Sequence, residues 1–446
     1  MQRRLHGLET VMFVLLAVVG MVAPHSYSRV LWALPAPQAR LYADFRGILL
    51  FLMDGPLLVL LVLTVGYVAV SAGFRQERWQ VARAVVMRGG AIFWVALLLW
   101  MGLTALWAPH PGLSVYVALR YGAGMVVALL IAFAVREERE SVVLWGLLIG
   151  AVFQALYALA QTLNGGALGF TYLGEIVWLE NNLFNMAERD FRAYGLAVHP
   201  NNLSGYLLVA LFAAVYMLRL RWHTRRGMFA MIAYVIATGL FLTFSRLAVV
   251  AAALVMVPLL LLFIDVRWRP PRSWVTWVVV AVLFGGVGLL GYRLADVVIF
   301  RFVNVFIYRD PLPARVTLGF ADAANVVLNH WRFGAGNGNL MVLAGADASL
   351  PGRLLLPPHN VYVIVLAELG LPGLILFLSG VTVTVYGVVR YRRYPLANLW
   401  GFCLLAMLAI MVFDYYFWLD YRSNMLLWWV LGLYWGNASL AGEAQS

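Results

Sequence analysis

Residues 360–388 read NVYVIVLAELGLPGLILFLSGVTVTVYGV, and this run decides the class of fold. Its one charged side chain is Glu368, and the run exceeds the about 17–25 apolar residues that a helix needs to cross a bilayer. Backbone polar groups cannot stay unpaired in hydrocarbon, so a segment of this kind crosses as a helix. The run therefore predicts an integral membrane protein.

The composition of the whole chain agrees with that prediction. Of the 446 residues, 63% are hydrophobic and only 12% are charged, and the mean hydropathy is +0.85. Soluble domains carry about 25% charged residues, and disordered chains combine many charges with few apolar residues. Both of these classes are excluded, and a polytopic membrane protein remains.

Apolar stretches between charged or Pro/Gly-rich interruptions predict about twelve transmembrane helices. No soluble domain separates them, so residues 1–446 are expected to form a single integral membrane domain of the all-α class. The expected spans are residues 8–24, 47–73, 90–108, 113–135, 141–163, 200–218, 228–244, 247–264, 274–292, 360–388, 398–413 and 423–438.

Basic residues in short loops set the orientation, because such loops stay in the cytoplasm. The basic segments that fall on one side when the spans are threaded are residues 3–4, 75–88, 136–140, 219–226, 267–272 and 390–393. We therefore expect both termini in the cytoplasm. The same threading leaves residues 164–199 and 293–359 outside, and the second of these is a large extracytoplasmic loop.

Every one of the 32 basic residues is Arg, and the formal net charge is +12. The guanidinium group suits phosphate, so the composition fits contact with anionic lipid or with a phosphorylated substrate; a GC-rich genome explains it equally well. Arginines in residues 293–359 run against the positive-inside tendency, and contact with phospholipid headgroups is one explanation. Nucleic acid is excluded because no soluble basic domain exists, and the single Cys403 excludes disulfides and Cys-based metal sites.

Two constellations at the expected outer face place an arginine beside a helix end. In residues 192–202, RAYGLAVHPNN, the amides Asn201 and Asn202 suit an N-cap, which leaves Arg192 unexplained. In Thr243-Phe-Ser245-Arg246, between two expected spans, Arg246 either marks the membrane edge or points into the bundle. An arginine beside a helix N-terminus is a natural seat for an anion.

Other candidates carry weaker signals. Residues 332–339, RFGAGNGN, are not a phosphate-binding P-loop, because no Lys-Ser/Thr follows, and they predict a tight surface turn. Asp54, Arg120 and Asp414 lie within or at the edges of expected spans, where charges are costly. Arg120 with either of these acids would form a structural ion pair.

The last constellation is Pro357-Pro358-His359-Asn360, directly before the apolar run. The prolines stop the loop, and His359 or Asn360 caps the helix that follows. The helix dipole disfavours protonation at this end, so the imidazole is expected to be neutral at about pH 7 and able to accept a proton. A capping histidine without chemistry is the competing interpretation.

Taken in order, these motifs resemble the O-antigen ligase/polymerase superfamily of bacterial membrane glycosyltransferases. The resemblance covers most of residues 190–375, whereas the first 190 residues match only in hydropathy. The motifs are Arg192-x-x-Gly195 with His199-Pro-Asn201, Ser245-Arg246, Gly334-x-Gly336-x-Gly338, and His359-Asn360 followed after nine residues by Gly370-x-x-Gly373. The last of them is the most specific.

The resemblance implies a GT-C-like fold of about twelve helices with a periplasmic loop between the ninth and tenth, in the bacterial inner membrane. It implies a glycan on undecaprenyl diphosphate as donor, an active site on the periplasmic face, and inverting transfer without a metal or other cofactor. His359 would be the general base. The residues implied to bind the diphosphate are Arg192, Arg246, Arg120 and Arg315, and those implied to support the site are Asn360, Asn201, Ser245, Gly336 and Gly370.

The resemblance leaves the acceptor open. Ligases transfer the glycan to lipid A-core, O-antigen and exopolysaccharide polymerases to another lipid-linked repeat unit, and related enzymes to Ser or Thr of a protein. The spacing after His359 favours a ligase. A transporter or flippase of lipid-linked glycans is the alternative from a different class, and it predicts paired repeats and interrupted helices with charges at the midplane. The sequence contains no visible repeat.

Overall fold

The computed structural model describes residues 2–34, 45–70, 83, 90–176, 191–220, 222–253, 285, 292, 312–346, 357–391 and 394–443. The chain divides into two compact units. Unit 1 combines Met1–Ala151 with Leu312–Ser446, and unit 2 is Val152–Pro311.

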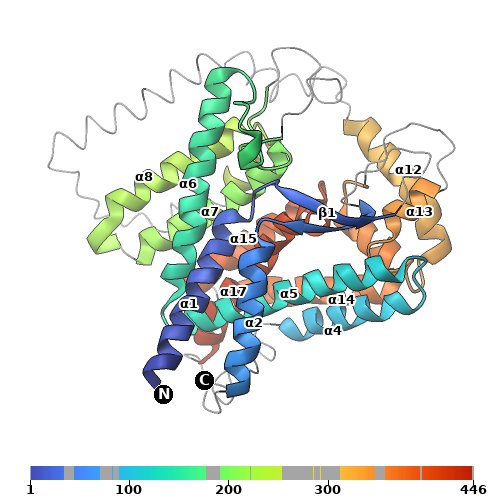
Figure 1. The fold of residues 1–446 in the computed structure, drawn as a ribbon, viewed down its shortest axis with the longest axis horizontal. Coiled ribbons are helices and arrows are strands. Elements are labelled where there is room, and N and C mark those ends of the chain that lie inside the picture. The colour runs from blue at the N-terminus through green and yellow to red at the C-terminus, as the bar shows by residue number, and fades with distance from the viewer. Residues whose placement is uncertain are drawn as a thin grey trace. The chain divides into compact units, whose positions relative to one another are not determined.

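Unit 1 is a helical bundle with one small β-hairpin (Figure 1). Its described elements are α1 (Gln2–Val22), β1 (Ser28–Ala33), β2 (Gly47–Phe51), α2 (Asp54–Val70), α4 (Ala91–Leu103), the 3₁₀ turn η2 (Thr104–Leu106), α5 (Pro111–Arg136), the first part of α6 (Glu140–Asn164), α12 (Leu312–His330), α13 (Leu340–Ala346), α14 (Val361–Arg390), α15 (Pro395–Ile410), α16 (Tyr416–Leu419) and α17 (Tyr421–Glu443).

Helices α5 and α17 pack along each other at the core of unit 1. Small residues bring the two backbones close, as a Cβ at Gly432 would lie only 2.4 Å from the carbonyl oxygen of Ala128. Aromatic side chains fill the space toward α4 and α14, which run side by side (Figure 1). The rings of Trp94 and Trp428 are 5.8 Å apart, and Tyr121 donates a hydrogen bond to the carbonyl of Trp418 at 2.7 Å.

Both ends of the chain lie at one end of unit 1 (Figure 1). Arg136 Nη1, at the end of α5, is 2.8 Å from Glu443 Oε1, at the end of α17. Arg139, just beyond α5, donates to Thr10 Oγ1 of α1 at 3.3 Å. An even number of crossings would produce this arrangement of the termini.

The β-hairpin corrects the prediction of an all-α fold and of a single span over residues 47–73. Strands β1 and β2 pair antiparallel, with Ser28 opposite Phe51, and the helix starts only at Asp54. Asp54 Oδ2 accepts a hydrogen bond from Phe51 N at 2.7 Å, which ties the end of the strand to the first residue of the helix. Every second side chain of β2, beginning with Gly47, is buried, the period of a strand.

Unit 2 is built around α7 (Pro200–Leu220) and α8 (Trp222–Leu242), which pack against each other. It also holds the rest of α6 from Val152 onward and the 3₁₀ turn η3 (Thr171–Leu173). A further helix begins at Arg246 and is described as far as residue 253.

The protein is a largely helical membrane protein. In the described part of the chain, four helices are long and apolar enough to cross a membrane, namely α5, α6, α7 and α14. Shorter apolar helices occur in α1, α2, α4, α8 and α15, and α17 covers the expected span 423–438. Most of the expected span 247–264 and of 274–292, and residues 293–311 and 347–356 of the expected loop, lie outside the described residues. The count of twelve spans therefore stays a prediction.

Candidate functional site

The first candidate cluster surrounds His359 at the start of α14 in unit 1. Asn360 is the N-cap residue, and its Oδ1 accepts a hydrogen bond from Val363 N at 3.0 Å, which confirms the predicted cap. Asn360 Nδ2 donates to the carbonyl of Val412 at 3.0 Å, and Val361 N donates to that of Met411 at 2.9 Å. These bonds fasten the start of α14 to the segment after α15.

Asp414 in that segment lies opposite His359. Its Oδ1 is 3.6 Å from His359 Nδ1, an ion-pair distance, and the two side chains are 7% and 20% exposed. The same oxygen accepts a hydrogen bond from Tyr415 N at 2.8 Å, and the ring of Tyr415 is 5.1 Å from the imidazole. A buried carboxylate, an aromatic ring and a partly exposed imidazole therefore form one cluster, which we call the His359 cluster.

The sequence did not predict this partner for His359. Asp414 was expected only as an alternative partner for Arg120, and nothing in the spacing links it to His359. The cost of a carboxylate at the end of an apolar span was the one available signal.

The loop that carries the glycine motif packs against the middle of α14. Gly370 has a φ of 66° and a ψ of −169°, so α14 consists of two helical segments that meet there. Ala335 N and Gly336 N donate to the carbonyls of Ala367 and Glu368, just before this break, at 2.9 and 3.0 Å. Leu371 N, just after it, donates to the carbonyl of Trp331 at 2.8 Å.

Residues 334–339 are therefore a buried structural loop rather than the expected surface turn. Gly334, Gly336 and Asn337 are buried, and Ser114 donates to the carbonyl of Asn337 at 2.7 Å. Gly336 lies too close to the connection between α4 and α5 to carry a side chain, because a Cβ there would lie 2.3 Å from the Cβ of Ala108. Its amides serve α14, which agrees with the prediction that the motif is not a P-loop.

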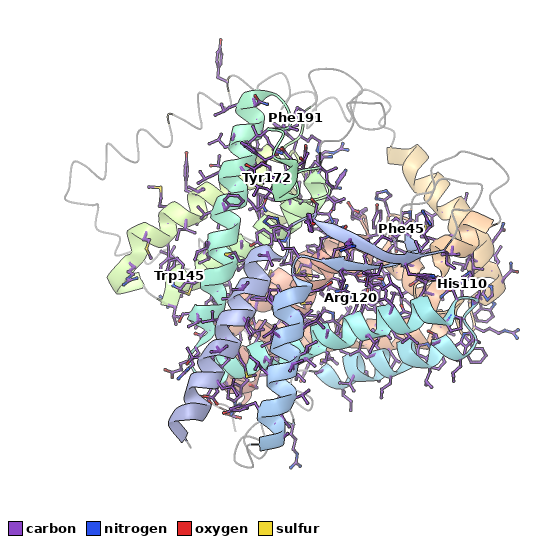
Figure 2. All side chains as sticks on the ribbon, in the orientation of Figure 1. Phe45, His110, Arg120, Trp145, Tyr172 and Phe191 are labelled. Carbon is purple, nitrogen blue, oxygen red and sulfur yellow. The ribbon has the colours of Figure 1, made fainter. Side chains whose placement is uncertain are left out.

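Arg120 of α5 (Figure 2) and Asp54 at the start of α2 form the predicted structural ion pair. Arg120 Nη1 pairs with Asp54 Oδ1, and Nη2 donates to Asp54 Oδ2 at 2.7 Å and to the carbonyl of Leu49 at 2.6 Å. The guanidinium also lies 5.1 Å from the ring centres of Phe51 and Tyr116. This engagement favours a structural role over diphosphate binding.

The second candidate cluster lies in unit 2, around Arg192. Its Nε donates to the carbonyl of Thr243 at 2.9 Å, and its Nη2 donates to Asn201 Oδ1 at 2.7 Å. The guanidinium therefore bridges the start of α7 and the end of α8. We call Arg192, Asn201, Thr243 and Arg246 the Arg192 cluster.

Asn201 was expected to cap α7, and this prediction is wrong. The helix already begins at Pro200, and His199 Nδ1 accepts a hydrogen bond from Asn201 N at 3.1 Å. The imidazole satisfies this first-turn amide, and the side chain of Asn201 accepts a hydrogen bond from Arg192. The asparagine supports the cluster in a different way from the one expected.

The turn that Arg192 contacts also carries Arg246. Phe244 has a φ of 47°, and Thr243 Oγ1 accepts a hydrogen bond from Ser245 N at 3.2 Å, so the chain reverses within these residues. A helix begins directly at Arg246. The structure thus brings Arg192 to the turn that directly precedes Arg246.

Glu175, to which the sequence assigned no role, anchors the segment after α6. It is 3% exposed, and its carboxylate accepts hydrogen bonds from Gln161 Nε2 at 2.7 Å, Leu168 N at 2.8 Å and Phe170 N at 2.9 Å. Burial raises the pKa of Glu175, but these hydrogen bonds to the charged form outweigh burial and hold the pKa below its ordinary value. Gln161 also accepts a hydrogen bond from Gly195 N at 2.8 Å, which links Glu175 to the Arg192-x-x-Gly195 motif.

Two expectations remain outside these clusters. Arg315 falls on α12, and its side chain is not among those described. In the described ranges, no three His, Cys, Asp or Glu side chains gather as a metal site would require. Metal-independent chemistry stays a prediction.

Residues 231–378 match the family model described as O-antigen ligase. The match includes Ser245-Arg246, the glycine motif and His359-Asn360 with Gly370 and Gly373, and it confirms the resemblance to the O-antigen ligase/polymerase superfamily. The match supports membership of this segment in the O-antigen ligase/polymerase superfamily and a ligase- or polymerase-type function. No curated protein matches the chain.

Proposed function

We propose that the protein transfers a glycan from undecaprenyl diphosphate to an acceptor hydroxyl, as an O-antigen ligase that acts on lipid A-core. The observation that carries the proposal is the His359 cluster, in which the histidine of the family motif lies against the buried carboxylate of Asp414. A cap alone does not need this carboxylate, because Asn360 performs the capping.

In the proposed reaction, His359 is the general base. A proton on Nδ1 is directed toward Asp414, which leaves the lone pair on Nε2. Nε2 takes the proton of the acceptor hydroxyl while that oxygen attacks the anomeric carbon of the donor. The bond from this carbon to the diphosphate oxygen breaks, and the configuration inverts. The Asp414 carboxylate stabilises the imidazolium that forms.

The leaving diphosphate needs fixed positive charge. We assign this role to Arg192 and Arg246, since preorganised cationic donors stabilise a departing oxyanion. Thr243 and Asn201 orient the Arg192 guanidinium, so that it does not have to be ordered during the reaction. Two guanidinium groups would perform the task that a divalent cation performs elsewhere.

Reconstitution with defined substrates tests the proposal. Purified protein is given an undecaprenyl diphosphate-linked glycan with lipid A-core, with no second acceptor, or with a Ser/Thr-containing peptide. Glycosylated lipid A-core would support the ligase, a lengthened donor glycan would indicate a polymerase, and a glycopeptide a protein glycosyltransferase. Absence of released undecaprenyl diphosphate in all three arms would contradict glycosyl transfer. Donor movement across vesicles without product would indicate a transporter instead.

The same assay tests the metal-independent mechanism. The rate is expected to be unchanged in EDTA, because Arg192 and Arg246 supply the positive charge. A loss that magnesium or manganese restores would contradict this part of the proposal.

A further inference from the structure

Two adjoining hollows lie in unit 1, beside the break in α14, and share Trp331, Arg332 and Phe333. The first has a volume of about 850 Å³ and is also lined by Trp100, Trp107 and the end of α12. The second, of about 520 Å³, continues along the first turns after Gly370. Because they share these three lining residues, we treat the two hollows together and call them the Arg332 recess.

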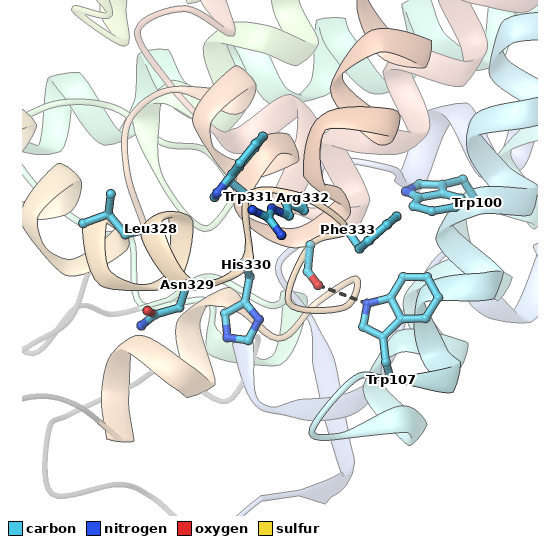
Figure 3. A pocket seen from close by; sticks show the side chains of 9 residues that line it. Trp100, Trp107, Leu328, Asn329, His330, Trp331, Arg332 and Phe333 are labelled. Atoms are coloured by element: carbon cyan, nitrogen blue, oxygen red, sulfur yellow. Dashed lines mark hydrogen bonds between the residues drawn. The ribbon is translucent and has the colours of Figure 1, made fainter.

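The first hollow is suited to an anion. Among the described residues that line it, the polar side chains are Arg332, His330 and Asn329, and none is acidic. Figure 3 shows Trp100 and Trp107 on one side of this hollow and Asn329 and His330 on the other. The guanidinium of Arg332 lies 5.4 Å from the ring centre of Trp331, which holds it at the edge of the hollow.

The second hollow is suited to a hydrocarbon chain. It is lined by Leu371, Pro372, Ile375 and Leu376 together with Trp331, Arg332 and Phe333. Ile375 is 54% exposed, and it lies on α14, one of the four helices able to cross a membrane. A groove on the exposed side of such a helix opens toward lipid.

Hydrogen bonds to the backbone build the recess in advance. Trp107 Nε1 donates to the carbonyl of Gly334 at 3.0 Å (Figure 3), and Trp100 Nε1 donates to that of Leu369 at 2.7 Å. The indole rings that line the first hollow are thus fixed in place. Tryptophans of this kind are enriched where the bilayer meets water, with one end apolar and the other hydrated.

We propose that the Arg332 recess binds a lipid with a phosphorylated, anionic headgroup. The phosphate lies against Arg332 in the first hollow, and an acyl chain follows the second hollow along Ile375. A free phosphate ion would not use the apolar groove, and a neutral lipid would not use the arginine. The inference does not depend on the proposed glycosyl transfer, because it uses neither His359 nor Arg192.

Native mass spectrometry of the purified full-length protein with phosphatidylglycerol tests this inference. Wild-type protein is expected to retain phosphatidylglycerol in preference to phosphatidylcholine. Arg332→Gln should weaken this binding by about tenfold or more, the effect of losing a charge-assisted hydrogen bond. Arg390→Gln is the matched control, because Arg390 is also exposed on unit 1 and lies 5.9 Å from the ring centre of Tyr391. If both variants lost phosphatidylglycerol binding equally, the binding would come from a general attraction between arginines and headgroups. That result would overturn the inference.

A second pair of variants tests the groove. Ile375→Trp should fill it and lower phosphatidylglycerol binding, whereas Leu378→Trp, at a 41% exposed residue outside the recess, should not. This pair decides the question by itself if Arg332→Gln cannot be purified. Inorganic phosphate in excess should not displace the lipid. Displacement by phosphate, or unchanged binding to Ile375→Trp, would overturn the inference.

Discussion

At the scale of single residues, His359 is positioned by its neighbours rather than by its own hydrogen bonds to the backbone. Asn360 caps α14 and binds the carbonyl of Val412, so the start of the helix is fixed whether or not residue 359 is a histidine. The contacts that belong to the imidazole itself are those with Asp414 and with the ring of Tyr415. A substitution of His359 should therefore leave the start of α14 intact and change only the contacts of the imidazole.

We expect His359→Ala to lower the rate of transfer about 10²–10⁴-fold, the usual contribution of a positioned base. Thermal unfolding should change little, because the cap is intact, and donor binding should persist. His110→Ala is the matched control, since His110 also precedes a helix and makes no capping bond with its side chain. A His359→Ala protein with close to the parental rate would contradict the assignment of the base.

The Asp414→Asn variant keeps a hydrogen-bond acceptor in this side chain but removes its negative charge. The amide oxygen can still accept from Tyr415 N, so the fold should survive, but the imidazolium formed in the reaction loses its counter-charge. A lower kcat with little change in KM supports the pairing of Asp414 with His359, whereas an unchanged kcat would leave the carboxylate without a part in the reaction.

The arginines of unit 2 test the leaving-group assignment. Arg246→Lys keeps the positive charge but not the planar fork that binds phosphate through two nitrogens. Turnover should fall by about tenfold or more, since one charge-assisted hydrogen bond is lost. Arg219→Lys, in the last turn of α7, should have no such effect. If Arg246→Lys has full activity, a point charge suffices and the bidentate role is wrong.

Glu175 links stability to pH. Its folded pKa is lower than the ordinary value of 4.5, so the carboxylate stabilises the protein at neutral pH. This stabilising contribution becomes smaller as the pH falls below 4.5, and it is lost once the pH has also fallen below the lowered pKa of the folded state. Glu175→Gln should therefore lower Tm at pH 7, and the difference from wild type should narrow on acidification. Glu137→Gln, at an exposed residue, is the control; an equal loss of Tm at every pH would contradict the linkage.

At the scale of elements, the loop of residues 334–339 joins α14 to the connection between α4 and α5. Gly336 has a φ of 98°, and a Cβ there would meet Ala108 Cβ at 2.3 Å. We expect Gly336→Ala to destabilise the fold by at least about 1–3 kcal/mol, from backbone strain alone. Gly122→Ala in α5, where a Cβ meets nothing within 4 Å, should be neutral or stabilising. Equal Tm values for the two variants would contradict this account of the motif.

Elements that depend on a local apolar run could be predicted from the sequence. The spans expected at 113–135, 141–163 and 200–218 are observed as Pro111–Arg136, Glu140–Asn164 and Pro200–Leu220. The hairpin could not be predicted in this way. Residues 47–51 are as apolar as the helix after them, and only pairing with the strand that begins at Ser28 makes them a strand.

In the candidate site, too, local features could be predicted from the sequence, whereas contacts between distant segments could not. The cap at Asn360 follows from residue type next to an apolar helix, and it is observed. The contacts of His359 with Asp414 and of Arg192 with Asn201 depend on how segments pack, and no spacing in the chain encodes them. Asn201 was misassigned because its side chain suits a cap as well as it suits an arginine.

At the scale of the whole molecule, contacts within unit 1 distinguish its two ends. Arg136 with Glu443 and Arg139 with Thr10 gather the termini and the expected cytoplasmic loop 136–140 at one end. α14 leads away from His359, and α15 returns toward it, so that the segment after α15 binds the start of α14. The expected orientation therefore requires His359 to lie on the side opposite to the loop between these two helices.

Topology mapping tests this requirement on the intact protein. Reporter fusions at both termini and at Arg225, Arg269 and Arg392 should report the cytoplasm, because arginines in short loops are retained there. A fusion at Arg332 should report the outside, on the same side as His359, where a lipid-linked donor with an extracytoplasmic glycan would be used. A control fusion within residues 136–140 should agree with the termini, since ion pairs and hydrogen bonds join these segments. A cytoplasmic signal at Arg332 would place the proposed base on the wrong side of the bilayer and overturn both the orientation and the reaction built on it.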